Sequence, residues 1–317
     1  MGNDDRCILI TGVQGFIASH LAEFLLGKGY PVIGIDNGLT GDRKHIASFE
    51  DHPDFVSVEG DVNNRQDLQP LIEKYRPEFI FHYAACVGVK RTLDHPLWVL
   101  RDIKGIENIV ELARQVGTRR VFFSSSSEVY GEPVEFPQNE NTTPLNSRLA
   151  YAVVKNIGEV YLKAYSQEYG QEYTIFRFFN TYGPRQSEDF VMSRFIRAAL
   201  DGSDLTIYGD GSQTRTFCYI DDNVEATYAA MESDAAANSV INIGSAIETP
   251  ILELAKEVLQ VSGADSRIVH LPPLPDGDMT RRLPDNTSML NLLGGRSLVT
   301  LEEGIERTLE YFSATYD

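Results

Sequence analysis

The chain has 317 residues, 42% of them hydrophobic, which is enough for a substantial core in two lobes or in one large α/β domain. Its formal charge is −18, from 46 acidic and 28 basic residues, and such a surface repels nucleic-acid phosphates and anionic lipids. We therefore expect neither nucleic acid nor a membrane as a partner, and an anionic small substrate would need arginines gathered locally.

The first half of the chain alternates short β-rich runs with amphipathic stretches. This pattern is typical of a parallel sheet with helices on both faces. The expected strands are 7–11, 32–36, 55–59, 79–82, 121–125 and 173–178, and the expected helices include 16–26, 99–115 and 151–169. The sequence therefore predicts an α/β fold with a doubly wound parallel sheet of the Rossmann type.

After residue 180 the pattern changes. Short strands at 205–208, 240–243 and 268–271 alternate with helices, and the loops become richer in Pro, Gly and Asp. We expect a first domain over 1–180 and a second, smaller α/β lobe over 181–317 that binds the substrate, with part of 216–247 returning to the first domain.

The amino-terminal segment MGNDDRCILITG is acidic and lacks the apolar region of a signal peptide. No apolar run approaches the roughly 20 residues of a membrane span. Cys7, Cys86 and Cys218 are far apart and lack metal-ligand spacing. We expect a soluble, cytoplasmic protein without a metal site.

The segment ILITGVQGFIASHL places Gly12 and Gly15 between a strand and a helix, spaced G-x-x-G-x-x-A. A side chain at either glycine would obstruct a pyrophosphate, and the helix N-terminus offers free N–H groups to it. A glycine turn is also ordinary structure, but its place after a strand and before a helix favours dinucleotide binding.

The next strand ends in Asp36, about 20 residues beyond the glycines. A carboxylate there accepts hydrogen bonds from ribose hydroxyls and repels a 2′-phosphate, which favours NAD over NADP. Asp61, after the third strand, is placed to meet the adenine amino group. The residues expected to bind NAD are Gly12, Gly15, Phe16, Ile17, Asp36, Asn37, Asp61, Val62, Tyr151 and Lys155.

YAVVK puts Tyr151 and Lys155 one helical turn apart on the same helix face. A nearby ammonium and the positive nicotinamide would favour the phenolate, so the pair could act as a general base. Y-x-x-x-K alone occurs easily by chance. Its context is a serine-rich strand end, about 25 residues earlier, at the edge where open α/β sheets bind ligands. A serine hydroxyl there could hold a substrate alcohol against Tyr151.

In chain order, the glycine turn, the acidic strand end, S-S-S-x-E-V-Y-G, Y-x-x-x-K, FFNTYGPRQ and YGDGSQTR resemble the NAD-dependent epimerase/dehydratase family of extended short-chain dehydrogenases/reductases. The resemblance covers nearly the whole chain and is closest in pattern to UDP-glucuronate decarboxylases, then to UDP-sugar 4-epimerases. It implies that Ser126 acts beside Tyr151 and Lys155. It also implies that Ser127 and Glu128 occupy positions where decarboxylases and dehydratases keep further acid/base groups.

The same resemblance implies a nucleotide sugar, UDP-linked, as substrate. Asn180 would hold the diphosphate or the sugar, and Tyr208 would lie against the nucleobase. Arg215 and Arg282 would bind the phosphates, and Arg185 would meet the sugar or a C6 carboxylate. Guanidinium groups suit both anions because they bind them with two hydrogen bonds.

Some positions depart from the family pattern. Asp102 stands where the family usually has Asn, and Gly294–Gly295 replace a Gly-Trp pair, for which we expect only a packing consequence. The segment HYAACVGVKR lacks the Ser/Pro-rich loop of decarboxylases and reads more like an epimerase; Lys90 within it is expected to face the substrate. The resemblance further implies a homodimer, formed through helices 99–115 and 151–169.

The reaction implied by the resemblance begins when Tyr151 removes the proton of the sugar C4 hydroxyl while hydride passes to NAD, which leaves a 4-keto sugar. Loss of carbon dioxide from a C6 carboxylate would make the protein a decarboxylase, reduction on the other face a 4-epimerase, and loss of water a dehydratase. Glu128 argues against simple epimerisation, which needs no third acid/base group. Ser127 argues against dTDP-glucose-type dehydratases, which place an aspartic acid there.

UDP-glucuronate decarboxylation is therefore the first choice, followed by 4-epimerisation of UDP-glucose or UDP-glucuronate, and then by dehydration. A non-catalytic NAD or nucleotide-sugar sensor is the alternative of another class. The intact set of Ser126, Tyr151 and Lys155 argues against it.

Overall fold

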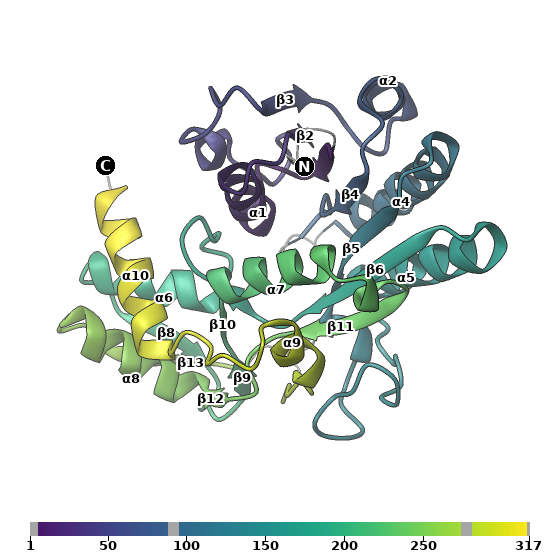
Figure 1. Ribbon diagram of the computed structural model, residues 1–317. Helices are drawn as coiled ribbons and strands as arrows, with labels where there is room; N and C mark the ends of the chain where they lie inside the picture. The colour runs from purple at the N-terminus through teal and green to yellow at the C-terminus, as the bar shows by residue number, and fades with distance from the viewer. Residues whose placement is uncertain (1–5, 88–94, 274–280, 316–317) are drawn as a thin grey trace. The chain divides into compact units, whose positions relative to one another are not determined.

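The computed structural model describes residues 6–87, 95–273 and 281–315 (Figure 1). The chain divides into two compact units. The first comprises Met1–Val129, Arg148–Arg177 and Thr227–Ile241, and the second comprises Tyr130–Ser147, Phe178–Ala226 and Asn242–Asp317. The chain thus passes repeatedly from one unit to the other.

A seven-stranded sheet with the order β11-β6-β5-β4-β1-β2-β3 forms the centre of the first unit. The chain runs outward from β1 to β3 and then continues on the other side of β1 with β4. The pairs β1–β2, β1–β4, β2–β3 and β4–β5 are parallel. The predicted doubly wound parallel sheet is therefore confirmed. The strands are β1 Ile8–Thr11, β2 Val32–Asp36, β3 Phe55–Glu59, β4 Phe79–His82, β5 Arg120–Ser126, β6 Glu172–Phe178 and β11 Ser239–Ile243.

Every residue of β1, β2, β4 and β5 is buried, as expected for parallel strands that are covered on both faces. The helices of the first unit are α1 Phe16–Gly27, α2 Arg65–Tyr75, α4 Pro96–Val116 and α5 Ala150–Tyr169. Figure 1 shows α4 and α5 side by side, and the two helices pack against each other. Apolar side chains of β1, β4 and β5 form one core cluster with those of α2, α4 and α5.

Helix α5 approaches β5 unusually closely. A Cβ atom at Gly158 would lie 2.3 Å from the Phe123 ring, so only glycine permits this spacing. Helices α4 and α5 both end at a left-handed glycine, Gly117 and Gly170. The close packing fixes the first turn of α5 relative to the carboxyl end of β5, where the predicted catalytic residues lie.

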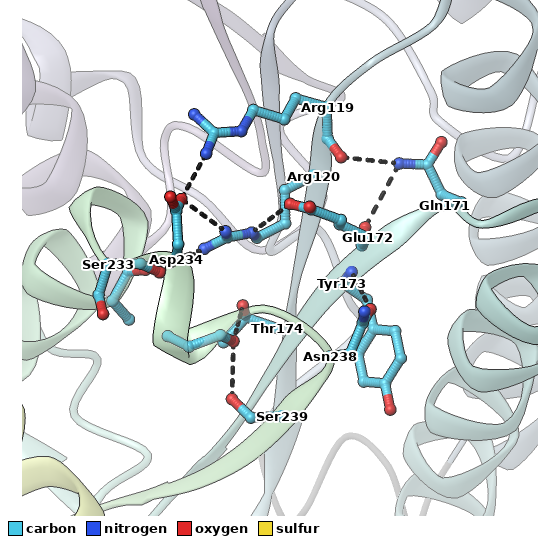
Figure 2. Close-up of polar contacts among 12 residues, drawn as sticks. Arg119, Arg120, Gln171, Glu172, Tyr173, Thr174, Ser233, Asp234, Asn238 and Ser239 are labelled. Atoms are coloured by element: carbon cyan, nitrogen blue, oxygen red, sulfur yellow. Dashed lines mark hydrogen bonds and ion pairs between the residues drawn. The ribbon is translucent and has the colours of Figure 1, made fainter.

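Strand β11, which lies within the segment 216–247 that the sequence analysis expected to return in part to the first domain, joins the large sheet beside β6. Figure 2 shows a polar cluster that joins the first residues of β5 and β6 to the segment immediately before β11. The fully buried Arg120 donates through Nε to Glu172 at 3.1 Å and through Nη1 to the carbonyls of Ala230 and Ser233 at 3.1 and 3.0 Å. Its pairing with β6 places this strand in the sheet of the first unit although it comes late in the chain.

The second unit contains helices and pairs of short strands. Helices α6 (Val191–Leu200), α8 (Ile251–Ser262) and α10 (Leu301–Ala314) pack against one another. Strand β8 pairs with β13 in parallel, β9 with β12 antiparallel and β7 with β10 in parallel. The remaining bounds, in either unit, are α7 Ile220–Glu232, α9 Thr287–Leu292, β7 Thr181–Tyr182, β8 Leu205–Tyr208, β9 Thr214–Thr216, β10 Cys218–Tyr219, β12 Glu248–Pro250, β13 Ile268–Leu271 and the short 3₁₀ helices η2 Arg43–Ile46, η3 Ser127–Tyr130 and η4 Asp234–Ala236.

None of the helices in the described part of the chain is both long and apolar enough to cross a membrane.

Candidate active site

The conformation of the glycine turn after β1 is fixed by neighbouring residues of the first unit. Gly12 has a φ of +74°, and a Cβ there would lie 2.8 Å from the backbone of Ala84. The Thr11 hydroxyl accepts hydrogen bonds from the backbone N–H groups of Tyr83 and Ala84, both at 3.1 Å, which holds the ends of β1 and β4 together. The sequence analysis excluded a side chain at Gly12 because of a ligand, but the neighbouring backbone already excludes it.

Gly15 occupies the N-cap position of α1, and no side chain in the described structure caps the helix there. The first-turn N–H groups, including those of Phe16 and Ile17, thus remain available for an anion, and the helix dipole favours negative charge at this end. A helix start of this kind fits a dinucleotide pyrophosphate.

Asp36 ends β2 beside the glycine turn. Its Oδ1 accepts a hydrogen bond from Gly38 N at 2.8 Å and its Oδ2 accepts one from Gln14 N at 2.9 Å. Each carboxylate oxygen keeps a second lone pair that can receive a ribose hydroxyl. The adjacent Asn37 is exposed, and its side chain accepts the backbone N–H of Leu39 at 3.0 Å.

Asp61 and Val62 follow β3. The Asp61 carboxylate accepts the N–H of Asn63 at 2.9 Å, and Val62 is buried. The structure thus places these two residues, the Asp36 strand end and the glycine turn at the carboxyl ends of β3, β2 and β1, which are neighbours in the sheet. This is the edge at which open parallel sheets bind ligands, and the residues present fit NAD.

Tyr151 lies in the first turn of α5, and Lys155 lies one turn later, with only 4% of its surface exposed. The Lys155 ammonium donates to the Ser124 hydroxyl at 3.3 Å and lies 5.8 Å from the centre of the Tyr151 ring. Burial lowers the pKa of Lys155 to about 8, although Asp102 acts in the opposite direction. The pair predicted from Y-x-x-x-K is therefore brought together, with the lysine buried beside the tyrosine ring.

The four serines at the end of β5 have different surroundings. Ser126 accepts the backbone N–H of Glu128 at 3.1 Å, and Ser127 is buried at the start of η3. Ser125 donates to Glu159 at 2.7 Å, and Ser124 is the partner of Lys155. The sequence analysis did not name Ser124. The two-residue period of a strand would have indicated it, because residues 124 and 126 share a face.

The predicted substrate residues Asn180, Arg185, Tyr208, Arg215 and Arg282 all belong to the second unit. Arg215 on β9 and Arg282 are both buried, and Arg215 Nη1 donates to the Thr214 carbonyl at 2.8 Å. Within the described residues, the Asn180 side-chain nitrogen is buried without a hydrogen-bond partner. A buried amide donor in that state normally meets a water or a ligand.

Two further substrate candidates have unusual surroundings. Arg185 has a φ of +67°, a left-handed conformation that is uncommon for residues other than glycine and that often occurs at functional sites. The ring of Tyr208, at the end of β8, has the Arg194 guanidinium 5.7 Å from its centre, a contact that the sequence analysis missed. Lys90 lies outside the described residues. In the parts of the chain that are described, no three His, Cys, Asp or Glu side chains gather so as to hold a metal ion.

The model of the NAD-dependent epimerase/dehydratase family matches residues 8–244. The chain belongs to this family. As a member, it is an enzyme with NAD as its cofactor, as predicted. It is 36% identical to the UDP-N-acetyl-alpha-D-glucosaminuronate decarboxylase of Bacillus cytotoxicus, over 97% of each chain. It is 37% identical to the UDP-glucose 4-epimerase of Mycolicibacterium smegmatis, over 96% of this chain and 97% of that protein.

Among solved structures, this family member resembles the UDP-glucuronic acid 4-epimerase of Bacillus cereus in complex with UDP-glucuronic acid and NAD. The TM-score is 0.90 at 31% identity, over 98% of this chain and 100% of the other. The agreement supports the Rossmann-type fold, and that structure was solved with NAD bound.

The role of Asp36 predicts which dinucleotide binds. We expect NAD to bind more tightly than NADP by at least several-fold, because the held carboxylate accepts ribose hydroxyls and repels a 2′-phosphate. Titration calorimetry with both dinucleotides measures this. In the Asp36→Asn variant the preference should shrink, and equal affinities in the unmodified protein would contradict the assignment.

Proposed function

We propose that the protein is a UDP-hexuronate decarboxylase that acts on UDP-glucuronate through transient oxidation at C4. The observation that carries this proposal is the arrangement at the end of β5. Glu128 follows Ser126 and Ser127 directly on η3, in the same unit as Tyr151 and Lys155. The likeness to a decarboxylase of a UDP-linked uronate supports the same reaction.

In the proposed reaction, Tyr151 takes the proton of the sugar C4 hydroxyl, and the buried ammonium of Lys155 favours the phenolate that does so. Ser126 holds the same hydroxyl. Bound NAD supplies the hydride acceptor, and its reduced form later supplies the hydride donor. The oxidised sugar is then a β-keto acid, in which the electrons of the breaking C5–C6 bond pass to the C4 oxygen as carbon dioxide leaves.

After carbon dioxide has left, C5 needs a proton. Glu128 is the candidate donor, because it is the carboxyl group on the strand end that carries Ser126 and Ser127. In the second unit, Arg215, Arg282 and Asn180 are the candidates to hold the UDP group, and Arg185 is the candidate for the C6 carboxylate before it leaves.

Epimerisation at C4 is the second candidate function. Two observations favour it: the segment around Cys86 reads like that of an epimerase, and both the Mycolicibacterium relative and the Bacillus cereus structure are 4-epimerases. Dehydration ranks third because Ser127 stands where dehydratases carry an aspartic acid.

Product analysis distinguishes these reactions. Incubated with UDP-glucuronate and no added reductant, the protein should release carbon dioxide and form UDP-xylose, identified by mass spectrometry and NMR. UDP-N-acetylglucosaminuronate and UDP-glucose extend the panel. A product of unchanged mass would reject decarboxylation in favour of the epimerase, and loss of water would indicate a dehydratase.

The Glu128→Gln variant tests, with the same substrate, whether Glu128 is the proton donor. It keeps the size of the side chain but removes the acid, so it should still oxidise the sugar and then stall. The absorbance of reduced cofactor should therefore persist in a single turnover. Full activity of Glu128→Gln would remove Glu128 from the proposal.

We also propose that two copies pair through α4 and α5. These adjacent helices leave large apolar side chains exposed, at Leu97, Leu100, Val153 and Val160. Exposed apolar patches on neighbouring helices commonly mark protein interfaces.

A further inference from the structure

The loop after β2 carries an Asn-Gly pair on the surface of the first unit. Asn37 and Gly38 directly follow Asp36, and both are exposed to solvent. Gly38 has a φ of +68°, and a Cβ atom built there would meet nothing within 4 Å. The space beside the peptide bond that joins the two residues is therefore open. An Asn-Gly pair occurs nowhere else in the chain.

Two hydrogen bonds in this loop involve the atoms that react when an asparagine cyclises. In that reaction the backbone nitrogen of the next residue attacks the carbon of the side-chain amide. Leu39 N donates to Asn37 Oδ1 at 3.0 Å, and this is the oxygen on which negative charge develops during the attack. Gly38 N, the attacking atom, donates its only proton to Asp36 Oδ1 at 2.8 Å. The Asp36 carboxylate is therefore placed to accept the proton that the nitrogen must lose.

The same two hydrogen bonds also stabilise the turn. Asp and Asn side chains commonly accept the backbone N–H two residues later, and glycine suits a left-handed φ. The turn thus explains why these residue types stand at Asp36, Asn37 and Gly38. It does not exclude the reaction, because the contacts that hold the turn are those that the cyclisation needs.

We propose that Asn37 is a site of spontaneous deamidation, and that this modification weakens the binding of NAD beside Asp36. Gly38 N forms a bond to Asn37 Cγ and loses its proton to Asp36 Oδ1, while the side-chain nitrogen takes up a proton and leaves as ammonia. Water then opens the cyclic imide. Opening at Cγ gives aspartate, and opening at the backbone carbonyl carbon gives isoaspartate, in which the main chain runs through Cγ.

Isoaspartate would change the surroundings of Asp36 in two ways. It lengthens the main chain by one methylene group between Asp36 and Gly38, which displaces the Gly38 N–H that now holds Asp36 Oδ1. It also adds a carboxylate next to Asp36, and two carboxylates in one site repel each other. Because Asp36 is the residue predicted to bind the adenosine ribose, we expect NAD affinity to fall. This inference concerns the cofactor and does not depend on which sugar the enzyme converts.

Peptide mapping of the incubated protein tests the modification directly. The purified protein is kept at slightly alkaline pH, and digests taken over time are analysed by liquid chromatography and mass spectrometry, which distinguish asparagine, aspartate and isoaspartate peptides. Asn238 is the internal control: it is exposed, has a φ of +56° and accepts the N–H of Tyr173 at 3.3 Å, but a serine follows it. Asn37 should deamidate at least roughly tenfold faster, because glycine has no side chain to obstruct the ring.

Two variants separate the chemistry from the turn. Asp36→Asn keeps an oxygen that can accept the Gly38 N–H but removes the base, so deamidation of Asn37 should slow several-fold. Asn37→Ser keeps a hydroxyl that can accept the Leu39 N–H but removes the amide, so this position should stay unmodified. Urea unfolding checks that both variants are folded.

Titration calorimetry before and after the incubation measures the effect on NAD. The deamidated protein, isolated by anion exchange, should bind NAD several-fold more weakly, whereas Asn37→Ser should keep its own initial affinity throughout. An Asn37 that stays intact, or that reacts no faster than Asn238, would overturn the inference. Equal rates with and without the Asp36 carboxylate would reject Asp36 as the base, and an unchanged affinity would reject the effect on NAD. None of these measurements requires turnover of a nucleotide sugar, so failure of the proposed function would leave them valid.

Discussion

Replacing Tyr151 by phenylalanine is expected to lower the turnover number by ~100-fold to 10,000-fold, the range typical for loss of a general base. The change removes one oxygen from the first turn of α5 and leaves the ring beside Lys155. NAD affinity and the free energy of unfolding should therefore stay close to those of the unmodified protein. Steady-state kinetics, calorimetric titration and urea unfolding measure the three quantities.

Tyr169→Phe is the matched control, because Tyr169 lies at the far end of the same helix with half of its surface exposed. It should leave turnover unchanged. If Tyr151→Phe kept more than about a tenth of the activity, the phenol would not be the base.

Replacing Glu159 by leucine should lower the free energy of unfolding by ~3–5 kcal/mol, the usual effect of removing one partner of a buried ion pair. Glu159 is fully buried and Arg177 is 2% exposed, so the variant would leave a guanidinium in the core without its carboxylate. The Ser125 hydroxyl would lose its acceptor as well. Urea unfolding at neutral pH measures the loss.

Two further variants make this test specific. Glu159→Leu combined with Arg177→Met should recover most of the stability, because both buried charges of the pair are then removed. Lys163 is the exposed partner of Glu159, with a distance of 3.5 Å between the two charged groups. Replacing Lys163 by alanine should lower the free energy of unfolding by less than ~1 kcal/mol. If Glu159→Leu cost no more than Lys163→Ala, the buried pair would not stabilise the fold.

The Glu159 pair also has a defined pH dependence. Burial alone would raise the pKa of Glu159, but Arg177 and Ser125 hold it below its ordinary value. A lowered carboxyl pKa gives stability that is present above the ordinary pKa and is lost as the pH falls through the folded-state value. The contribution is therefore complete at neutral pH.

The strands of the Rossmann-type sheet could be predicted because parallel strands covered on both faces are continuous apolar runs. Strand β4 is an example, with the buried sequence FIFH. The sequence analysis expected part of 216–247 to return to the first domain, but the pairing of β11 with β6 could not be predicted, because it is long-range. The burial of Arg120 could not be predicted either. An arginine at the start of a strand is usually exposed, whereas this one is fully buried and donates to carbonyl groups more than 100 positions later in the chain.

In the active site, the sequence motifs indicated which residues lie on one helix face, but not which side chains of the strands contact them. The spacing of Tyr151 and Lys155 on one helix face follows from the helical repeat alone. That Ser124 on β5 contacts Lys155, and that Arg177 on β6 pairs with Glu159, depends on how α5 lies on these two neighbouring strands. The spacing of α5 and β5 is set by Gly158, whose role no pattern of polar residues reveals.

The late position of β11 in the chain has a consequence for biosynthesis. Strand β6 is buried along most of its length, yet the neighbour that completes its hydrogen bonding is synthesised about 60 residues later. Until then the nascent sheet has an open apolar edge, which is a template for pairing with other chains. A polypeptide that ends near residue 180 would keep that edge permanently and leave Arg120 without its carbonyl partners. Such a fragment should aggregate and should not form an independent nucleotide-binding domain.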